Sequence, residues 1–176
     1  SGGKEDAGLA DPGSLIIRRC TLIGRGWVVY NWSGRNNSIT IENSELHGAR
    51  WIIANARSSG ADGGTFIVKD SVIYGDSTQS TYQGLVGRRL AGIVSGGGHN
   101  TVTNCKFYLT GDPTMDLVAG VWNGGESGPN PSATQEIINS DFFLTGNGAD
   151  PASVIAFDVK EGGTITVTGG SVTINN

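Results

Sequence analysis

A short sequence pattern recurs six times along this chain of 176 residues, and it constrains the fold more than any other feature. In each copy, apolar residues at alternate positions precede a small polar pair, and further alternating apolar residues follow it. Such alternation places every second side chain on one face of an extended strand. Each copy therefore predicts a strand, a sharp corner and a second strand. The copies are LIIRRCTLIG from Leu15, ITIENSELHG from Ile39, FIVKDSVIYG from Phe66, NTVTNCKFYLTG from Asn100, QEIINSDFFLTG from Gln135 and ITVTGGSVTI from Ile165.

When the copies are aligned, equivalent positions carry similar residues. Two columns hold branched and aromatic side chains typical of a buried strand face: Ile17, Ile41, Val68, Val102, Ile137 and Val167 before the corner, and Leu22, Leu46, Ile73, Phe107, Phe142 and Val172 after it. The corner residues are mostly types that tolerate left-handed backbone, which predicts a sharp turn. Stacked amides in this column are also expected to hydrogen-bond between copies. The corner column reads Arg19, Asn43, Asp70, Asn104, Asn139 and Gly169.

The position after the corner is small in every copy, and it holds both cysteines, Cys20 and Cys105. If the copies stack in register, these cysteines lie three coils apart, about 14 Å at a strand spacing of roughly 4.8 Å. A disulfide requires Cα atoms within about 6 to 7 Å. We therefore expect two free, buried and unreactive thiols, the alternative being a reactive or metal-ligating cysteine. The remaining members of this column are Ser44, Ser71, Ser140 and Gly170.

The sequence segments between the copies predict a third strand in each coil, followed by a Gly-rich loop. The third strands are read at 27–32, 51–56, 90–95, 117–122 and 153–159. Asn31 and Asn55 are 24 residues apart in two of them, so they are expected to form a ladder. Three strands per coil in parallel register describe an all-β solenoid, the parallel β-helix, of about six coils. We place it at residues 14–176 and expect residues 1–13 to be a flexible tail. The alternative is an antiparallel β-sandwich, which would not need one type of corner residue at every repeat.

These features resemble the pectate-lyase-like superfamily of right-handed, single-stranded parallel β-helices. Its members often read strand, Gly-rich turn, then an apolar–polar–apolar–Asn-Ser core. The resemblance runs from Leu15 to Asn176. It implies the fold rather than one activity, because the superfamily includes polysaccharide lyases, glycoside hydrolases, viral tailspikes, autotransporter passengers and surface adhesins.

Composition bears on the partners. The formal net charge is -4, whereas a nucleic-acid partner requires a clustered excess of Lys and Arg. No uninterrupted apolar run approaches the roughly 18 to 20 residues that span a bilayer, and residues 1–13 lack the apolar core of a signal peptide. Neither end of the repeat shows an element that would cap the unpaired strand edges. We therefore expect the chain to be a segment of a longer protein or to be covered by partner subunits. Tailspikes of the superfamily that this chain resembles commonly form trimers. The resemblance therefore implies a homo-oligomer, specifically a trimer.

Candidate ligand-binding residues come from successive third strands, and about half of them are expected to share one exposed face. Sugar recognition combines aromatic rings with charged groups that hydrogen-bond to hydroxyls. Trp27 and Trp51, 24 residues apart, are expected simply to cover the first two coils, and His47 is expected to face solvent. The candidate carbohydrate-binding residues are Tyr30, Trp32, Arg57, Trp122, Asp158 and Lys160.

An enzymatic alternative uses Arg88 or Arg89 with acidic residues of the later coils. In pectate lyases, an arginine on such a surface acts as the base beside calcium-binding aspartates, so a lyase-like reading implies calcium. A hydrolase reading needs two carboxylates about 5 to 10 Å apart, for which Asp116 or Glu126 with Asp158 are the candidates.

The sequence thus favours a non-enzymatic, structural or adhesive β-helix module, needing no cofactor and located on a virion or outside the cell. Surface polysaccharide is its expected ligand. A polysaccharide lyase or glycoside hydrolase that acts on the third-strand face is the alternative.

Overall fold

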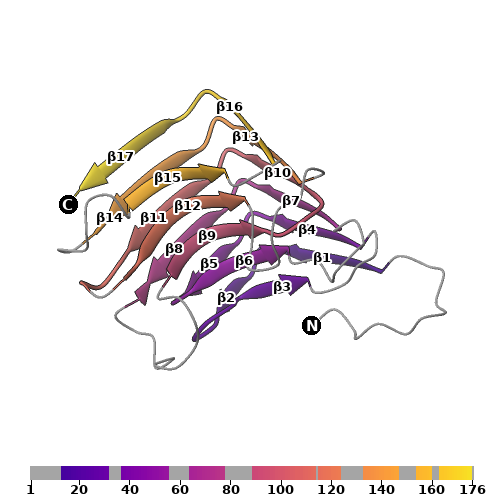
Figure 1. Ribbon diagram of the computed structural model, residues 1–176. Coiled ribbons are helices and arrows are strands. Elements are labelled where there is room, and N and C mark those ends of the chain that lie inside the picture. Colours follow the sequence, from indigo (N-terminus) through magenta and orange to yellow (C-terminus); the bar gives the residue numbers. More distant parts are fainter. Residues whose placement is uncertain are drawn as a thin grey trace.

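A computed structural model of the chain describes residues 13–31, 37–55, 64–77, 89–113, 115–123, 133–146, 154–159 and 163–175. These residues form three sheets, and every strand pairs in parallel and in register with its counterpart in the next coil. The strands follow one another around the coil as the chain rises from its indigo end to its yellow end (Figure 1). The fold is a right-handed parallel β-helix, as the sequence predicts, and the parallel pairing excludes the β-sandwich.

Each sheet collects one strand from successive coils. Sheet A contains β1 (Ser14–Arg18), β4 (Ser38–Glu42), β7 (Thr65–Lys69), β10 (His99–Thr103), β13 (Thr134–Ile138) and β16 (Thr164–Thr168). Sheet B contains β2 (Thr21–Ile23), β5 (Glu45–Gly48), β8 (Val72–Asp76), β11 (Lys106–Thr110), β14 (Asp141–Thr145) and β17 (Ser171–Asn175). Sheet C, formed by the predicted third strands, contains β3 (Val29–Asn31), β6 (Trp51–Asn55), β9 (Arg89–Ser95), β12 (Leu117–Asn123) and β15 (Val154–Val159).

The corner between sheets A and B has the left-handed backbone that the corner column predicts. Its five non-glycine members, Arg19, Asn43, Asp70, Asn104 and Asn139, have φ between 47° and 53°. The predicted bonding along the column is seen where Asn104 Nδ2 donates to Asp70 Oδ1 at 3.1 Å. In the last copy Gly169 takes the corner position at φ 69°. All six corner residues thus have left-handed backbone.

The small residues after the corner form a hydrogen-bonded ladder. Ser44 Oγ accepts from the backbone N–H of Cys20 at 3.2 Å and donates to the Glu42 carbonyl at 2.8 Å. Ser71 Oγ repeats this arrangement, accepting from Ser44 and donating to Lys69. The ladder explains why the sequence keeps this position small.

Both thiols are free, as predicted, but only one is buried. Cys105 is buried, and burial raises the pKa of its thiol to about 11. Cys20 is exposed, so the expectation that it is buried is wrong. Cys20 belongs to the first described coil, and its column gains a covering neighbour on one side only. The burial of a side chain in a solenoid depends on the adjacent coils. Equivalent positions are therefore less buried in an end coil than in a central coil.

The interior is a continuous apolar core that sheet C and the two predicted columns build together, except for the last members of the columns, Val167 and Val172, which are exposed because no described coil covers them. Phe107 and Phe142 stack in it, with ring centroids 4.5 Å apart and planes inclined by 8°. Ile41, Ile73 and Ile137 have no exposed surface. Within the described residues, no helix has the length and apolar character to cross a membrane. The rigid, filled core means that ligands must bind outside it.

A buried amide ladder runs beside this core, at the edge of sheet C that leads back to sheet A. Asn31 Nδ2 donates to Asn55 Oδ1 at 3.1 Å, which confirms the predicted pair. Asn55 Nδ2 donates to Asn100 Oδ1 at 3.0 Å, and Asn100 Nδ2 donates to Gln135 Oε1 at 2.8 Å. The next residue in register with Gln135 is Ile165. The Gln135 amide nitrogen therefore has no partner among the described residues, and the ladder ends there.

Candidate functional site

A column of stacked rings stands on the outer face of sheet B. It consists of His47, Tyr74, Tyr108 and Phe143, which we call the aromatic column. Each ring follows an inward-facing core residue of its strand, so strand alternation turns it outward. The ring centroids are 4.7, 5.4 and 4.9 Å apart in this order, with interplanar angles of 16°, 15° and 7°. Strand spacing alone produces this stack, because in-register strands place equivalent side chains one above another.

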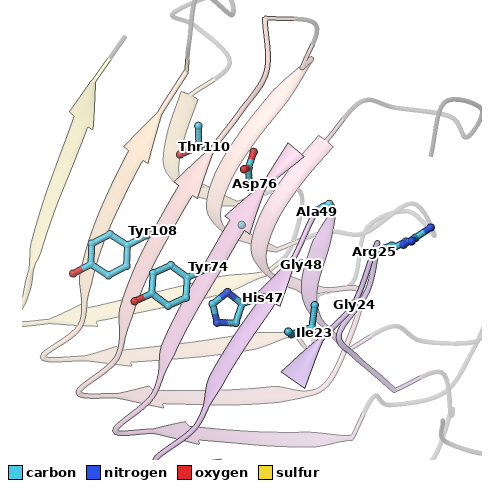
Figure 2. Close-up of a pocket in the computed structure, with 11 residues that line it drawn as sticks. Ile23, Gly24, Arg25, His47, Gly48, Ala49, Tyr74, Asp76, Tyr108 and Thr110 are labelled. Atoms are coloured by element: carbon cyan, nitrogen blue, oxygen red, sulfur yellow. The ribbon is translucent and has the colours of Figure 1, made fainter. Parts of the chain in front are cut away.

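An open groove of about 490 Å³ runs beside the aromatic column, and we call it the sheet B groove. Figure 2 shows the rings of His47, Tyr74 and Tyr108 in one row, with Asp76 and Thr110 farther along the same strands. Its volume lies in the range of small-ligand sites, about 300 to 1,000 Å³. Its described lining comes from four successive coils: Ile23, Gly24, Arg25, His47, Gly48, Ala49, Tyr74, Gly75, Asp76, Tyr108 and Thr110.

The groove combines apolar surface with groups that hydrogen-bond. Ile23 at one end is 81% exposed, while Tyr74 and Tyr108 keep 36% and 37% of their surface. Arg25 supplies a guanidinium and Asp76 a carboxylate among the described lining residues. A mixture of ring edges, hydroxyl groups and single charges of each sign can bind a polar, uncharged ligand.

The outer face of sheet C is apolar and buried, unlike the outer faces of the other two sheets. β6 and β12 are buried at every position, whereas β4 and β7 alternate. The outward residues form a second apolar cluster, in which Trp51 contacts Trp122 edge to face at 5.5 Å. Trp27, as expected, packs on Trp51 in the first two coils at 6.3 Å. The buried members of the cluster are Trp51, Ala54, Ala91, Val94, Leu117, Ala119 and Trp122.

Three of the sequence-predicted carbohydrate-binding residues belong to one column of this face. Tyr30, Trp122 and Asp158 align through the register of β3, β6, β9, β12 and β15. Trp122, however, has no exposed surface. The expectation that Trp122 presents an exposed ring is therefore wrong, because other atoms of the chain pack on the side that alternation turns outward. Tyr30 and Asp158 are half-buried.

The enzymatic candidates are only partly brought together. The Arg89 guanidinium lies 4.9 Å from the centre of the Trp122 ring, where it makes a cation–π contact. Asp158 pairs in register with Trp122, which is six residues beyond Asp116. At about 3.3 Å per residue, that offset separates Asp116 from Asp158 by roughly 20 Å along the strand. The two carboxylates are thus too far apart for the distances that glycoside hydrolysis needs.

Several sequence-predicted residues lie outside the part of the chain that the structure describes: Trp32, Arg57, Arg88, Glu126 and Lys160. Their proposed roles remain predictions. Among the described residues, no group of three or more His, Cys, Asp or Glu side chains is arranged to hold a metal ion.

The aromatic column was available in the sequence but was not recognised as a candidate. It occupies the position directly after the second core column of the repeat, where successive copies read Ile23, His47, Tyr74, Tyr108, Phe143 and Thr173. The predicted site drew on third-strand residues instead. The signal for it in the sequence is the run of rings in this outward column.

Comparison of the chain with protein-family models, with curated proteins and with solved structures found no match. The site is therefore interpreted from its own geometry and chemistry.

Proposed function

We propose that this chain is a non-enzymatic β-helical module of a virion or cell-surface protein, similar to tailspikes and adhesins of the pectate-lyase-like superfamily, and that it binds surface polysaccharide. The proposed binding site is the sheet B groove. One observation carries the proposal: a partly exposed aromatic column borders an open groove that crosses four coils.

The dimensions of the groove suit a polymer. Four successive coils cover about 14 Å along the axis at roughly 4.8 Å per coil. Each coil contributes the same kind of position, so the surface repeats along the direction in which a glycan chain would extend. The filled core and regular ladders hold these positions in place, which lowers the entropy cost of binding.

The lining supports binding more than bond cleavage. Hydrolysis of a glycosidic bond uses two carboxylates flanking it, whereas Asp76 is the carboxylate that the described residues bring to the groove. The Tyr, Thr and Arg side chains of the groove can hydrogen-bond to a glycan, but they do not supply the pair of carboxylates that hydrolysis uses.

The direct test is binding of the purified chain to a panel of neutral and acidic polysaccharides, with and without calcium, followed by calorimetry on the hits. We expect the double variant Tyr74→Ala/Tyr108→Ala to bind at least about tenfold more weakly, as for contact residues at the centre of an interface. Glu136→Gln, an exposed change on sheet A, serves as the matched control and should bind as wild type.

Two results would contradict the proposal. The first is a wild-type chain that binds none of the panel. The second is turnover, seen as new reducing ends or unsaturated sugars, that is lost in Asp158→Asn; it would establish the lyase or hydrolase alternative.

We also propose that the module assembles as a homo-oligomer, with the trimer of the tailspikes as the specific expectation. Leu15 and Ile16 of β1 are exposed apolar residues outside the sheet B groove, and they support the proposal that a second subunit covers this part of the first described coil. Light scattering over a wide concentration range should give a multiple of the 18.2 kDa chain mass. A monomer throughout that range would contradict assembly.

A further inference from the structure

We infer that the sheet B groove recognises its ligand through the phenol groups and ring edges of Tyr74 and Tyr108, not through ring-face stacking, and that the ligand class is a neutral, hydroxyl-rich glycan. This inference rests on the proposed function and makes it more specific.

The ring faces of both tyrosines are already covered. Tyr74 lies between His47 and Tyr108, and Tyr108 lies between Tyr74 and Phe143. The centroid spacings of 4.7 to 5.4 Å and the near-parallel planes leave no room for a sugar ring between them. The exposed third of each tyrosine must therefore be its edge and its hydroxyl group.

The phenol oxygens are available for a ligand. Figure 2 shows both at the outer tips of their rings, pointing in the same direction and away from Asp76 and Thr110, so they form the outer border of the groove. Neither is hydrogen-bonded to another described residue. Because the rings are nearly parallel, the two oxygens are separated by about as much as the ring centres. A ligand that offers hydroxyl groups at each successive coil can bond to both.

The charge of the site favours an uncharged ligand. The described lining carries one guanidinium, of Arg25, and one carboxylate, of Asp76, while the whole chain has a net charge of -4. A polyanion would meet overall repulsion and no cluster of cations. The electropositive ring edges instead suit the oxygen atoms of sugar hydroxyls.

The experiment compares Tyr74→Phe, Tyr108→Phe and the double Phe variant with wild type, using cellohexaose, mannohexaose, xylohexaose and hexagalacturonate as probes. Phe retains the ring and its stack, so folding should be unaffected. We expect each lost hydroxyl to weaken binding of a neutral hexasaccharide about fivefold, the effect of one net hydrogen bond. We also expect the affinity to change less than about twofold between low salt and about 0.3 M salt, since a neutral ligand has no ion pair to screen.

The outcomes separate the inference from the proposed function. If the Phe variants bind as wild type while Tyr74→Ala/Tyr108→Ala does not bind, the groove is the site but hydroxyl recognition is refuted. If hexagalacturonate binds more tightly than every neutral probe, the neutral class is refuted. If wild type binds no glycan of the wider panel, the proposed function itself fails.

Discussion

Replacing Asn55 with Leu tests the buried amide ladder, which depends on three coils being in register. Asn55 has no exposed surface, accepts a hydrogen bond from Asn31 and donates to Asn100 and to the Gly64 carbonyl. Leu keeps the branching of Asn at Cγ, although its two methyl groups are larger than the amide oxygen and nitrogen, so some overpacking adds to the cost. The Gly64 carbonyl retains the backbone N–H of His99 at 3.1 Å, whereas the Asn100 oxygen loses the donor that Asn55 supplies.

A buried polar group that loses its hydrogen-bond partner costs about 1 to 3 kcal/mol. We therefore expect Asn55→Leu to lower the free energy of unfolding by about 2 kcal/mol. Urea unfolding followed by circular dichroism measures it, with tryptophan fluorescence as a second probe of cooperativity.

The same substitution at Asn175, an exposed residue at the end of β17, is the matched control. It should change the free energy of unfolding by less than about 0.5 kcal/mol. An Asn55→Leu variant within that limit of wild type would refute the reasoning, because the ladder would then contribute no more than an exposed amide.

Three further predictions concern other parts of the fold. Hydrogen bonds from Lys69 and Arg18 hold the pKa of Glu42 below its ordinary 4.5, so its stabilising contribution is present above that pH and is lost as the pH falls. The difference in melting temperature between wild type and Glu42→Gln should therefore shrink below pH 4.5, and a constant difference would contradict the pairing. Iodoacetamide should label Cys20 in the native protein and Cys105 only after unfolding, as mass spectrometry would show; equal labelling would contradict the burial. Phe107→Ala should cost about 3 to 5 kcal/mol in urea unfolding, and a loss below about 1 kcal/mol would contradict a filled core.

The repeat predicted the fold because its columns carry physical requirements that only a stacked coil satisfies together. A left-handed corner at Asn43, a small residue at Ser44 and an apolar pair around them are each weak signals. Because these signals recur together in six copies, the simplest arrangement stacks all copies along one axis. The φ values and the in-register strand pairs agree with it. Even the Asn31 to Asn55 hydrogen bond followed from a spacing of 24 residues.

What the repeat could not predict depends on neighbours outside the pattern. Alternation turns Trp122 outward, but it does not say what packs on that side, and the ring is buried. Cys20 occupies the same column as Cys105 yet is exposed, because its coil is at the edge of the described stack. The separation of Asp116 from Asp158 required the register between strands, which sequence distance does not give.

The aromatic column was missed for a different reason. Its members differ in chemical class, from His47 through two tyrosines to Phe143, so no single residue type marks the position. Only their common orientation and one-strand spacing make them a surface.

The central claim is that neighbouring coils are in register beneath this column, and a disulfide test measures it most directly. In a Cys20→Ser/Cys105→Ser background, we would compare His47→Cys/Tyr74→Cys with His47→Cys/Tyr108→Cys under mild oxidation, reading cross-links by mass spectrometry of the digested protein. His47 and Tyr74 are partners on adjacent strands, about 4.8 Å apart and within disulfide reach, whereas His47 and Tyr108 are two strands apart, about 10 Å. The account predicts that the first pair closes and the second does not. Closure of the second pair in the monomer, or failure of the first in a folded protein, would contradict it.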